Sequence, residues 1–298
     1  MPPDEKPLRL GTRGSRLALV QAEMAAKALG SGVEIVVLKT TGDRIQDRPL
    51  ADSGGKGLFV KELEEALLER RIDLAVHSMK DVPVVLPAGL SIAALLPRED
   101  PHDVFVSNSA PSLAALPVGA RVGTSSVRRV AQVKRARPDV ETVLLRGNVD
   151  TRLMKLDRGE MEAMILARAG LKRLRLEQRA TEVLEFLPAL AQGAIGIEVR
   201  AEDARTLAAI TRLNDADTEA ALACERAFQA ALGGSCRSPI AGLATVDAGR
   251  VHFRGEVIAP DGSDFVVSEI DSARSDAEGA GREAGLSIRA RAARWLDL

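Results

Sequence analysis

The sequence predicts an α/β protein with two duplicated lobes, followed by a small α+β C-terminal domain. Three observations carry this prediction: strands and helices alternate along the first part of the chain, one set of segments recurs, and the pattern changes after residue 217. At ~150 residues per domain, the 298 residues are enough for two or more domains. A composition of 46% hydrophobic and 28% charged residues is typical of a globular protein with more than one core.

The duplication consists of three pairs of segments that recur in the same order. In each copy a short apolar strand runs through Gly-Thr into a helix, a second strand follows, and a further helix leads to a third strand. This order is typical of α/β lobes with parallel strands. The first copy covers 8–22, 33–43 and 59–79, and the second covers 120–133, 140–150 and 151–167.

The segments after the second copy indicate a different kind of domain. Residues 188–200 have the pattern of a buried strand without helices of its own, so we expect this strand to return to one of the lobes. A helix is expected over 218–231, followed by short strands separated by glycine-containing turns. The acidic run 271–278 is interpreted as the solvated start of a final helix. The strands are expected at 240–246, 251–258 and 265–270, and the final helix at 276–295.

These segments predict three domains. Domain 1 comprises 1–98 and 190–213, and domain 2 comprises 99–189. Domain 3, with a three-stranded antiparallel sheet, comprises 214–298.

Charge and composition exclude several classes of function. The chain has 41 Lys and Arg against 42 Asp and Glu, and this net charge of −1 gives no basic footprint for nucleic acid or an anionic membrane. Six Phe and one Trp are too few to form stacking platforms for single-stranded nucleic acid. No apolar stretch approaches the ~18 residues of a membrane helix, and the N-terminus lacks a secretory pattern. Two cysteines and three scattered histidines predict neither a disulfide framework nor a metal site, so we expect a cytoplasmic protein.

Two glycine-containing junctions predict anion binding. Gly11–Ser15 and Gly123–Ser126 each lie where a strand leads into a helix, so backbone N–H groups and the helix dipole favour an anion there. Neighbouring arginines add forked positive charge suited to carboxylates. The alternative is that the serines only cap the helices and the arginines face solvent. The recurrence of the junction favours anion binding. The arginines concerned are Arg13, Arg16, Arg128 and Arg129.

A Lys-Asp pair marks a second candidate site. Lys80 and Asp81 directly follow an apolar strand, at the sheet edge where ligands of α/β proteins bind. Asp81 is therefore a candidate catalytic carboxylate and Lys80 an anion ligand, although a turn aspartate beside a surface lysine fits equally well. His77 alternates with apolar positions of the strand and is interpreted as a structural imidazole. The stretch 41–57 lacks the spacing of a phosphate-binding loop and is either a mobile lid or an ordinary loop.

Further arginines and a cysteine complete the candidate residues. Cys224 lies on the apolar stripe of a helix and is expected to be a core residue, whereas Cys236 lies in a loop beside Arg237, which favours thiolate. No histidine is placed as its base, so Cys236 fits covalent attachment better than hydrolase chemistry. Arginines at the carboxyl ends of strands, or in the loops after them, predict a cleft for a small polyanion. They are Arg128, Arg129, Arg146, Arg152 and Arg173.

Six segments together resemble the porphobilinogen deaminase family, and they recur in the family's order over nearly the whole chain. They include Gly-Thr-Arg-x-Ser, His-Ser-Met-Lys-Asp-Val-Pro and Gly-Thr-Ser-Ser-x-Arg-Arg. Two residues depart from the pattern: Ser235 precedes Cys236 where many members have Gly, and Arg237 follows it in place of an uncharged residue. The family's geometry for this loop is therefore carried over with less support. The segments are 11–19, 54–63, 76–83, 123–129, 145–149 and 192–198.

The resemblance implies two lobes like type II periplasmic binding proteins and a small α+β domain. It implies a dipyrromethane cofactor joined to Cys236 by a thioether, and condensation of four porphobilinogen molecules head to tail with release of ammonia. Water then releases hydroxymethylbilane. Asp81 matches the catalytic aspartate, whose carboxylate contacts pyrrole N–H groups and stabilises cationic intermediates. The protein is expected to be a monomer that needs no metal and hands its product transiently to the next pathway enzyme.

The resemblance also assigns roles to single residues. The alternative is a non-catalytic two-lobed receptor or sensor domain for a small anion, which leaves the Cys236 loop without a role. The implied cofactor-binding residues are Cys236, Lys80, Asp81, Ser126, Arg128, Arg129 and Arg146. The implied substrate-binding residues are Arg13, Ser15, Arg152, Arg173 and Gln192, and the implied lid residues are Lys56 and Phe59.

Overall fold

The computed structural model describes residues 6–40, 59–233 and 238–296. The chain divides into two compact units, and each is described by itself. The first contains the described residues up to Glu99 together with Ala194–Glu219, and the second contains Asp100–Gly193 and Ala220–Leu298. Within the described residues, no helix combines the length and the apolar character needed to cross a membrane.

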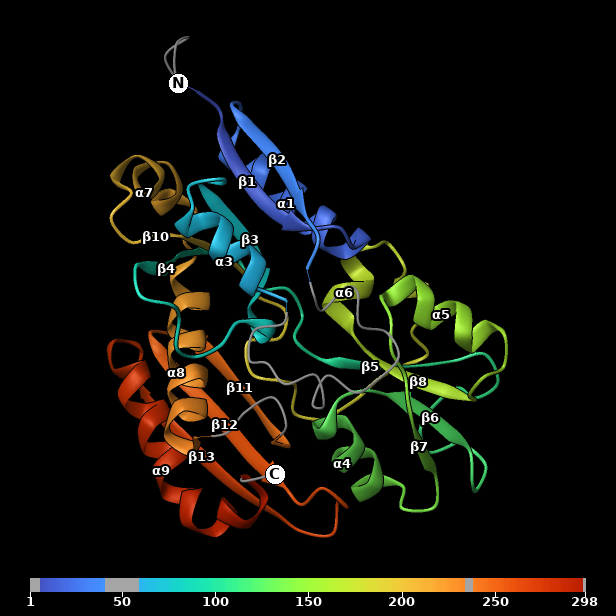
Figure 1. Ribbon diagram of the computed structural model, residues 1–298. Coiled ribbons are helices and arrows are strands. Elements are labelled where there is room, and N and C mark those ends of the chain that lie inside the picture. The colour runs from blue at the N-terminus through green and yellow to red at the C-terminus, as the bar shows by residue number, and fades with distance from the viewer. Residues whose placement is uncertain (1–5, 41–58, 234–237, 297–298) are drawn as a thin grey trace. The chain divides into compact units, whose positions relative to one another are not determined.

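A five-stranded mixed sheet in the order β2-β1-β3-β10-β4 forms the core of the first unit (Figure 1). β1 runs parallel to β2 and β3, whereas β10 is antiparallel to β3 and β4. The strand expected within 188–200 forms β10 and joins a lobe as expected, where it is antiparallel to both of its neighbours. The strands are β1 (Leu8–Arg13), β2 (Val33–Leu38), β3 (Leu74–Ser78), β4 (Leu90–Leu95) and β10 (Ile195–Arg200).

The second unit contains a sheet of matching topology, in the order β7-β6-β8-β5-β9. β6 runs parallel to β7 and β8, and β5 is antiparallel to β8 and β9, so each position has its counterpart in the first sheet. This correspondence confirms the predicted duplication. The strands are β5 (Asp103–Ser107), β6 (Arg121–Thr124), β7 (Glu141–Leu144), β8 (Ala163–Ala167) and β9 (Glu182–Val183).

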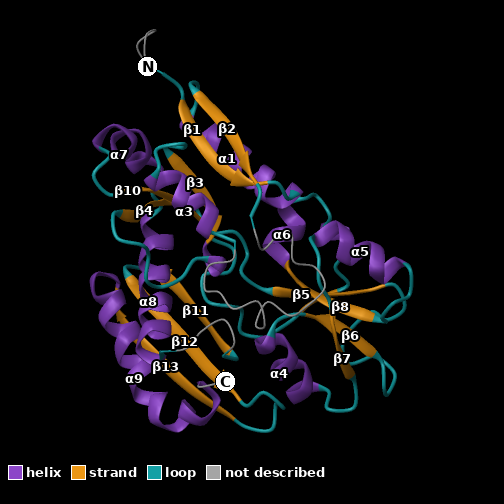
Figure 2. Cartoon of the chain, in the orientation of Figure 1, coloured by secondary structure: helices purple, strands orange, loops and turns teal. Residues whose placement is uncertain are grey.

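Helices cover the sheets because alternate strand residues present apolar side chains to both faces. In the first unit, α1 packs over Leu10 and Leu74, whereas α3 packs over Ala75 on the opposite face (Figure 2). Side-chain caps begin several helices: Ser15 caps α1 and Ser126 caps α4. The helices are α1 (Arg16–Leu29), α3 (Lys61–Leu68), α4 (Val127–Ala136), α5 (Val149–Asp157), α6 (Arg168–Arg173) and α7 (Ala204–Ile210).

The C-terminal part of the second unit is an antiparallel three-stranded sheet with α8 and α9 alongside it (Figure 1). The two helices are in close contact at Gly281. A Cβ at this position would collide with the backbone carbonyl of Cys224, so the close approach depends on glycine. The predicted α+β fold is confirmed. The elements are α8 (Ala216–Leu232), β11 (Ile240–Asp247), β12 (Arg250–Ile258), β13 (Phe265–Ala273) and α9 (Ala277–Leu296).

The acidic run 271–278 differs from its expected place at the start of the final helix. Its first residues extend β13, where the Asp271 carboxylate pairs with Arg250 and His252 of β12. A 3₁₀ turn then precedes α9. The backbone ladder with β12 thus continues to Ala273, and the final helix begins only at Ala277.

Candidate active site

The end of β3 places Lys80 and Asp81 in a 3₁₀ turn, Met79–Asp81. The strand before it is anchored on both sides. The Gln21 amide of α1 donates to the Ser78 hydroxyl at 2.9 Å, and the His77 Nε2 lies 2.8 Å from a Glu198 carboxylate oxygen of β10. These contacts hold the turn at the carboxyl end of a central strand.

The two predicted functional residues in this turn have different surroundings. Lys80 is exposed, and the side chain of Asp81 is half-buried. Among the described residues, no hydrogen bond or ion pair engages the Asp81 carboxylate. The carboxylate is therefore available to a ligand, as a catalytic group requires.

His77 is a structural imidazole, as the sequence indicates, because the side chains of His77 and Glu198 are 2% and 1% exposed. Glu64 of α3 lies in the same buried acidic cluster. Burial, and then the charge of Glu198, raise the pKa of the Glu64 carboxyl, while His77 opposes this shift. The cluster joins α3, β3 and β10 beneath the Asp81 turn.

At the start of α1, the structure shows the helix cap that the sequence left as the alternative to anion binding, but not the solvent-facing arginine that went with it. The Ser15 hydroxyl accepts the Ala18 N–H at 3.3 Å and so caps the helix, which leaves its own O–H to donate elsewhere. Arg13 is not simply solvated, because its guanidinium lies 4.1 Å from the centre of the Phe59 ring. This stack brings together one predicted substrate residue and one predicted lid residue.

In the second unit, the predicted arginines Arg128 and Arg129 meet a residue that the sequence analysis missed, Asp103. Their Nη2 atoms lie 2.8 and 2.7 Å from the two Asp103 oxygens. The predicted residue Gln192 joins them, because its Nε2 donates to Asp103 at 2.8 Å. The signal in the sequence is an aspartate opening the otherwise apolar strand β5, since a buried charge needs a partner.

This cluster is almost completely buried and sets two guanidiniums against one carboxylate. Asp103 is 0% exposed, and Arg128 and Arg129 are 3% and 6% exposed. Burial alone would raise the pKa of the Asp103 carboxyl, but the two guanidiniums outweigh it and hold the pKa below its usual range. A further anion would therefore compensate the excess buried charge.

The remaining predicted arginines lie in the same unit but not all at strand ends. Arg146 lies in the loop after β7, is 7% exposed, and has a pKa lowered by burial. The Nε of Arg152 in the first turn of α5 donates to the Gly147 carbonyl at 2.8 Å. Arg173 differs from the prediction: it is the last residue of α6, because β8 ends at Ala167 and a short helix follows.

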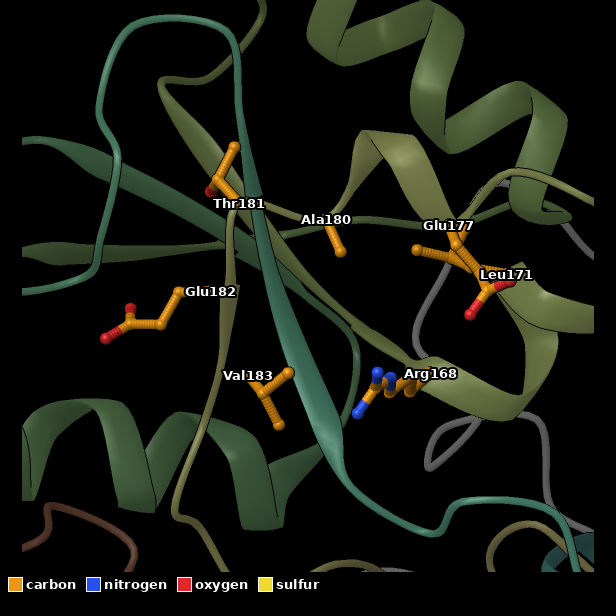
Figure 3. A pocket seen from close by; sticks show the side chains of 7 residues that line it. All are labelled: Arg168, Leu171, Glu177, Ala180, Thr181, Glu182 and Val183. Carbon is orange, nitrogen blue, oxygen red and sulfur yellow. The ribbon is translucent and has the colours of Figure 1, made fainter.

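A small cavity of about 170 Å³ lies elsewhere in the second unit (Figure 3). Its polar groups already serve the fold: Glu182 accepts the Leu113 N–H at 2.8 Å, and Arg168 pairs with Asp100 at 2.7 Å. It includes none of the predicted site residues. Its lining residues are Arg168, Leu171, Glu177, Ala180, Thr181, Glu182 and Val183.

Comparison with known proteins identifies the family. A model described as the dipyromethane cofactor binding domain of porphobilinogen deaminase matches residues 8–208, and one for the C-terminal domain of the same enzyme matches 220–290. A porphobilinogen deaminase of Nitrobacter hamburgensis is 52% identical over 293 residues, which cover 95% of this chain and 93% of the relative. The chain belongs to the porphobilinogen deaminase family.

A second porphobilinogen deaminase, from Nitrobacter winogradskyi, is 51% identical with the same coverage. Among solved structures, a putative methionine-binding lipoprotein from Bacillus subtilis has a TM-score of 0.43 at 13% identity, covering 70% of this chain and 90% of its own. The VFT2 domain of BvgS from Bordetella pertussis has a TM-score of 0.41 at 14% identity, covering 69% and 85%. Nothing in the comparisons favours the receptor alternative.

The arginine cluster fits the anionic cofactor of porphobilinogen deaminases. Each pyrrole of a dipyrromethane carries an acetate and a propionate group. The Nε of Arg128 is buried and has no hydrogen-bond partner in the described residues, although buried donors are normally satisfied. A carboxylate at this atom would satisfy the donor and balance the excess positive charge.

Of the two cysteines, the structure describes Cys224. Cys236, with Lys56, Ser235 and Arg237, lies outside the described residues. Cys224 is 0% exposed in α8, and burial, followed by the charge of Glu225, raises its pKa to about 12. Cys224 is therefore a core residue, as the sequence indicates, and a poor nucleophile.

We expect Cys224 to resist maleimide in the native protein at pH 7.5. Only the thiolate reacts, and a pKa of about 12 leaves a negligible thiolate fraction at this pH. Peptide mass mapping after labelling for hours should show an unmodified Cys224, whereas labelling in urea should modify it fully. Rapid labelling of the native protein would contradict the assignment.

Proposed function

We propose that this protein condenses four porphobilinogen molecules head to tail into hydroxymethylbilane, in tetrapyrrole biosynthesis. Each addition breaks the aminomethyl C–N bond of the incoming porphobilinogen, whose nitrogen leaves as ammonia, and joins the freed methylene carbon to the α-carbon of the terminal pyrrole, which loses its proton. In the final step, water cleaves the bond between the cofactor and the tetrapyrrole: its hydroxyl goes to the methylene carbon and its proton to the cofactor. The match of both family domains over most of the chain carries this proposal.

The proposed catalytic residue is Asp81. Loss of ammonia leaves positive charge on the pyrrole ring and makes its N–H more acidic. A half-buried carboxylate with no hydrogen-bond or ion-pair partner in the described part of the chain can accept hydrogen bonds from such N–H groups and stabilise that charge. Asp81 is also proposed to assist proton transfer as ammonia leaves, because a positioned carboxyl group can take up and give back a proton.

The proposed roles of the basic residues follow from the carboxylates of the pyrroles. Guanidinium groups bind carboxylates through two parallel hydrogen bonds, a geometry that an ammonium group cannot reproduce. The buried ion pairs to Asp103 hold two of these guanidiniums in fixed orientations. Ser126, Lys80, Arg128, Arg129 and Arg146 are proposed to hold the cofactor, and Arg13, Ser15, Arg152, Arg173 and Gln192 to hold the substrate.

Cys236 is proposed as the attachment point of the dipyrromethane. When bound, this group supplies the pyrrole carbon to which the first substrate is joined. Lys56 and Phe59 are proposed as lid residues, and the stack of Phe59 on Arg13 supports a link between the lid and substrate binding. The departures Ser235 and Arg237 leave the thiol in place.

We also propose a domain organisation, an oligomeric state and a cellular compartment for this chain. The chain would work in the cytoplasm as a monomer, with three domains over 1–98 with 190–213, 99–189, and 214–298. A transient hand-off of hydroxymethylbilane to the next enzyme would protect the linear product. Matching sheets in the two units and a separate antiparallel sheet support the three-domain division.

Intact-protein mass spectrometry tests this function. The purified protein should carry a covalent adduct of two pyrrole units, located at Cys236 by peptide mapping. Addition of porphobilinogen should then produce a ladder of one-pyrrole increments. An active protein with an unmodified mass would contradict the attachment, and an adduct without a ladder or turnover would favour a receptor.

A further inference from the structure

A line of buried polar side chains leads from the arginine cluster to the C-terminal sheet. Arg128, which bonds Asp103 through Nη2, donates from Nη1 to the Gln132 Oε1 at 2.7 Å, one turn further along α4. The Gln132 Nε2 donates in turn to Glu256 of β12 at 3.1 Å. Gln132 and Glu256 are 0% and 2% exposed, so solvent cannot replace these bonds.

The orientation of the Gln132 amide decides whether Arg128 faces its oxygen, which accepts a hydrogen bond, or its NH2 group, which cannot. Arg128 has only donors, so the amide must present its oxygen to it. Glu256 accepts the Gln132 Nε2 and has no donor when ionised, which excludes the flipped amide. The Leu187 carbonyl supports the same orientation, because it accepts from both Gln132 and Arg128 at 2.8 and 2.9 Å.

Glu256 is itself held by a second arginine. Arg135 of α4 pairs with the Glu256 carboxylate at 3.0 Å and stacks on the Phe265 ring at 4.7 Å. Gly262 lets the turn between β12 and β13 lie directly on this helix, since a Cβ there would meet the backbone of Arg135. The C-terminal sheet thus contacts α4 at a defined register.

We propose that Glu256, acting through Gln132, is a positioning residue that fixes the Arg128 guanidinium for its anionic ligand. Two Arg128 nitrogens are committed to Asp103 and to Gln132, and Nε remains for the ligand. The inference rests on the proposed function for the identity of that ligand. It assigns the C-terminal sheet a part in ligand binding through β12.

A donor–acceptor swap tests the proposal. Glu256→Gln leaves one side-chain oxygen to serve both Gln132 and Arg135, and Gln132→Glu places carboxylate oxygens against Glu256 and the Leu187 carbonyl. Because Arg128 is proposed to hold the cofactor, each single variant should slow formation of the dipyrrole adduct from porphobilinogen about 10-fold, equivalent to about 1.4 kcal/mol. In the double variant, the amide at 256 donates to Glu at 132 and its oxygen accepts from Arg135, so adduct formation should be faster than in Gln132→Glu alone, with the Leu187 carbonyl contact as the remaining loss.

Two further measurements separate positioning from loss of folding. Melting temperature should be higher in the double variant than in Gln132→Glu alone, and the kcat of the adduct-bearing protein should stay within 2-fold of wild type in every variant. Glu269→Gln is the matched control, because it removes a carboxylate from an exposed pair with Arg254 on the same sheet and should leave adduct formation unchanged. Additive losses in the double variant, or singles indistinguishable from the control, would overturn the proposal. A wild-type protein without adduct and turnover would instead overturn the proposed function.

Discussion

Asp81→Asn is expected to lower the turnover of porphobilinogen by about 10²–10⁴-fold while the protein stays folded. The amide keeps the size of the side chain but carries no charge, so it cannot stabilise positive charge on the pyrrole or take part in proton transfer. Because no described residue pairs with the Asp81 carboxylate, its replacement breaks no ion pair. The loss should therefore fall on catalysis and not on stability.

Steady-state rates and thermal melting of the two proteins check this expectation. Asp247→Asn is a suitable control, because it changes an exposed carboxyl at the end of β11. In the intact-mass experiment, Asp81→Asn should form the one-pyrrole ladder much more slowly than the control. A turnover within 2-fold of wild type would remove Asp81 from the mechanism.

Asp103→Asn is expected to destabilise the second unit by about 3–5 kcal/mol at pH 7. The substitution leaves two buried guanidiniums, Arg128 and Arg129, without the carboxylate that both of them bind. The single amide oxygen of Asn would have to serve Arg128, Arg129 and Gln192, which now share two carboxylate oxygens. Urea unfolding of both proteins gives the difference, and Glu278→Gln, in an exposed pair with Arg282, should cost less than about 1 kcal/mol.

The difference in stability between wild type and Asp103→Asn should depend on pH. The pKa of Asp103 in the folded protein lies below its unfolded value, so its contribution is present above the unfolded pKa and is lost as the pH falls towards the folded pKa. Wild type should therefore lose stability on acidification more steeply than Asp103→Asn. A stability difference that stays constant from pH 7 to pH 3 would contradict this role of Asp103.

The duplication, the C-terminal sheet and the places of several candidate residues at element ends were predictable because their signals are local. Each junction such as Gly123–Ser126 contains its own turn, cap and strand end within a few residues. The position of Asp81 followed from the same logic, since the strand Leu74–Ser78, which begins with three apolar residues, directly precedes its turn. The antiparallel direction of β10 did not follow, because it depends on where the chain re-enters the sheet.

The sequence by itself determined the two lobes, the third sheet and the residues that bear charge at the strand ends, because hydrophobic periodicity and turn residues act over short distances. Only the tertiary structure decided which charges are paired. Asp103 lies 26 residues before Arg129, and Glu256 lies 124 residues after Gln132. A buried charge takes whichever partner the packed elements bring within hydrogen-bond distance, and no spacing along the chain encodes that choice.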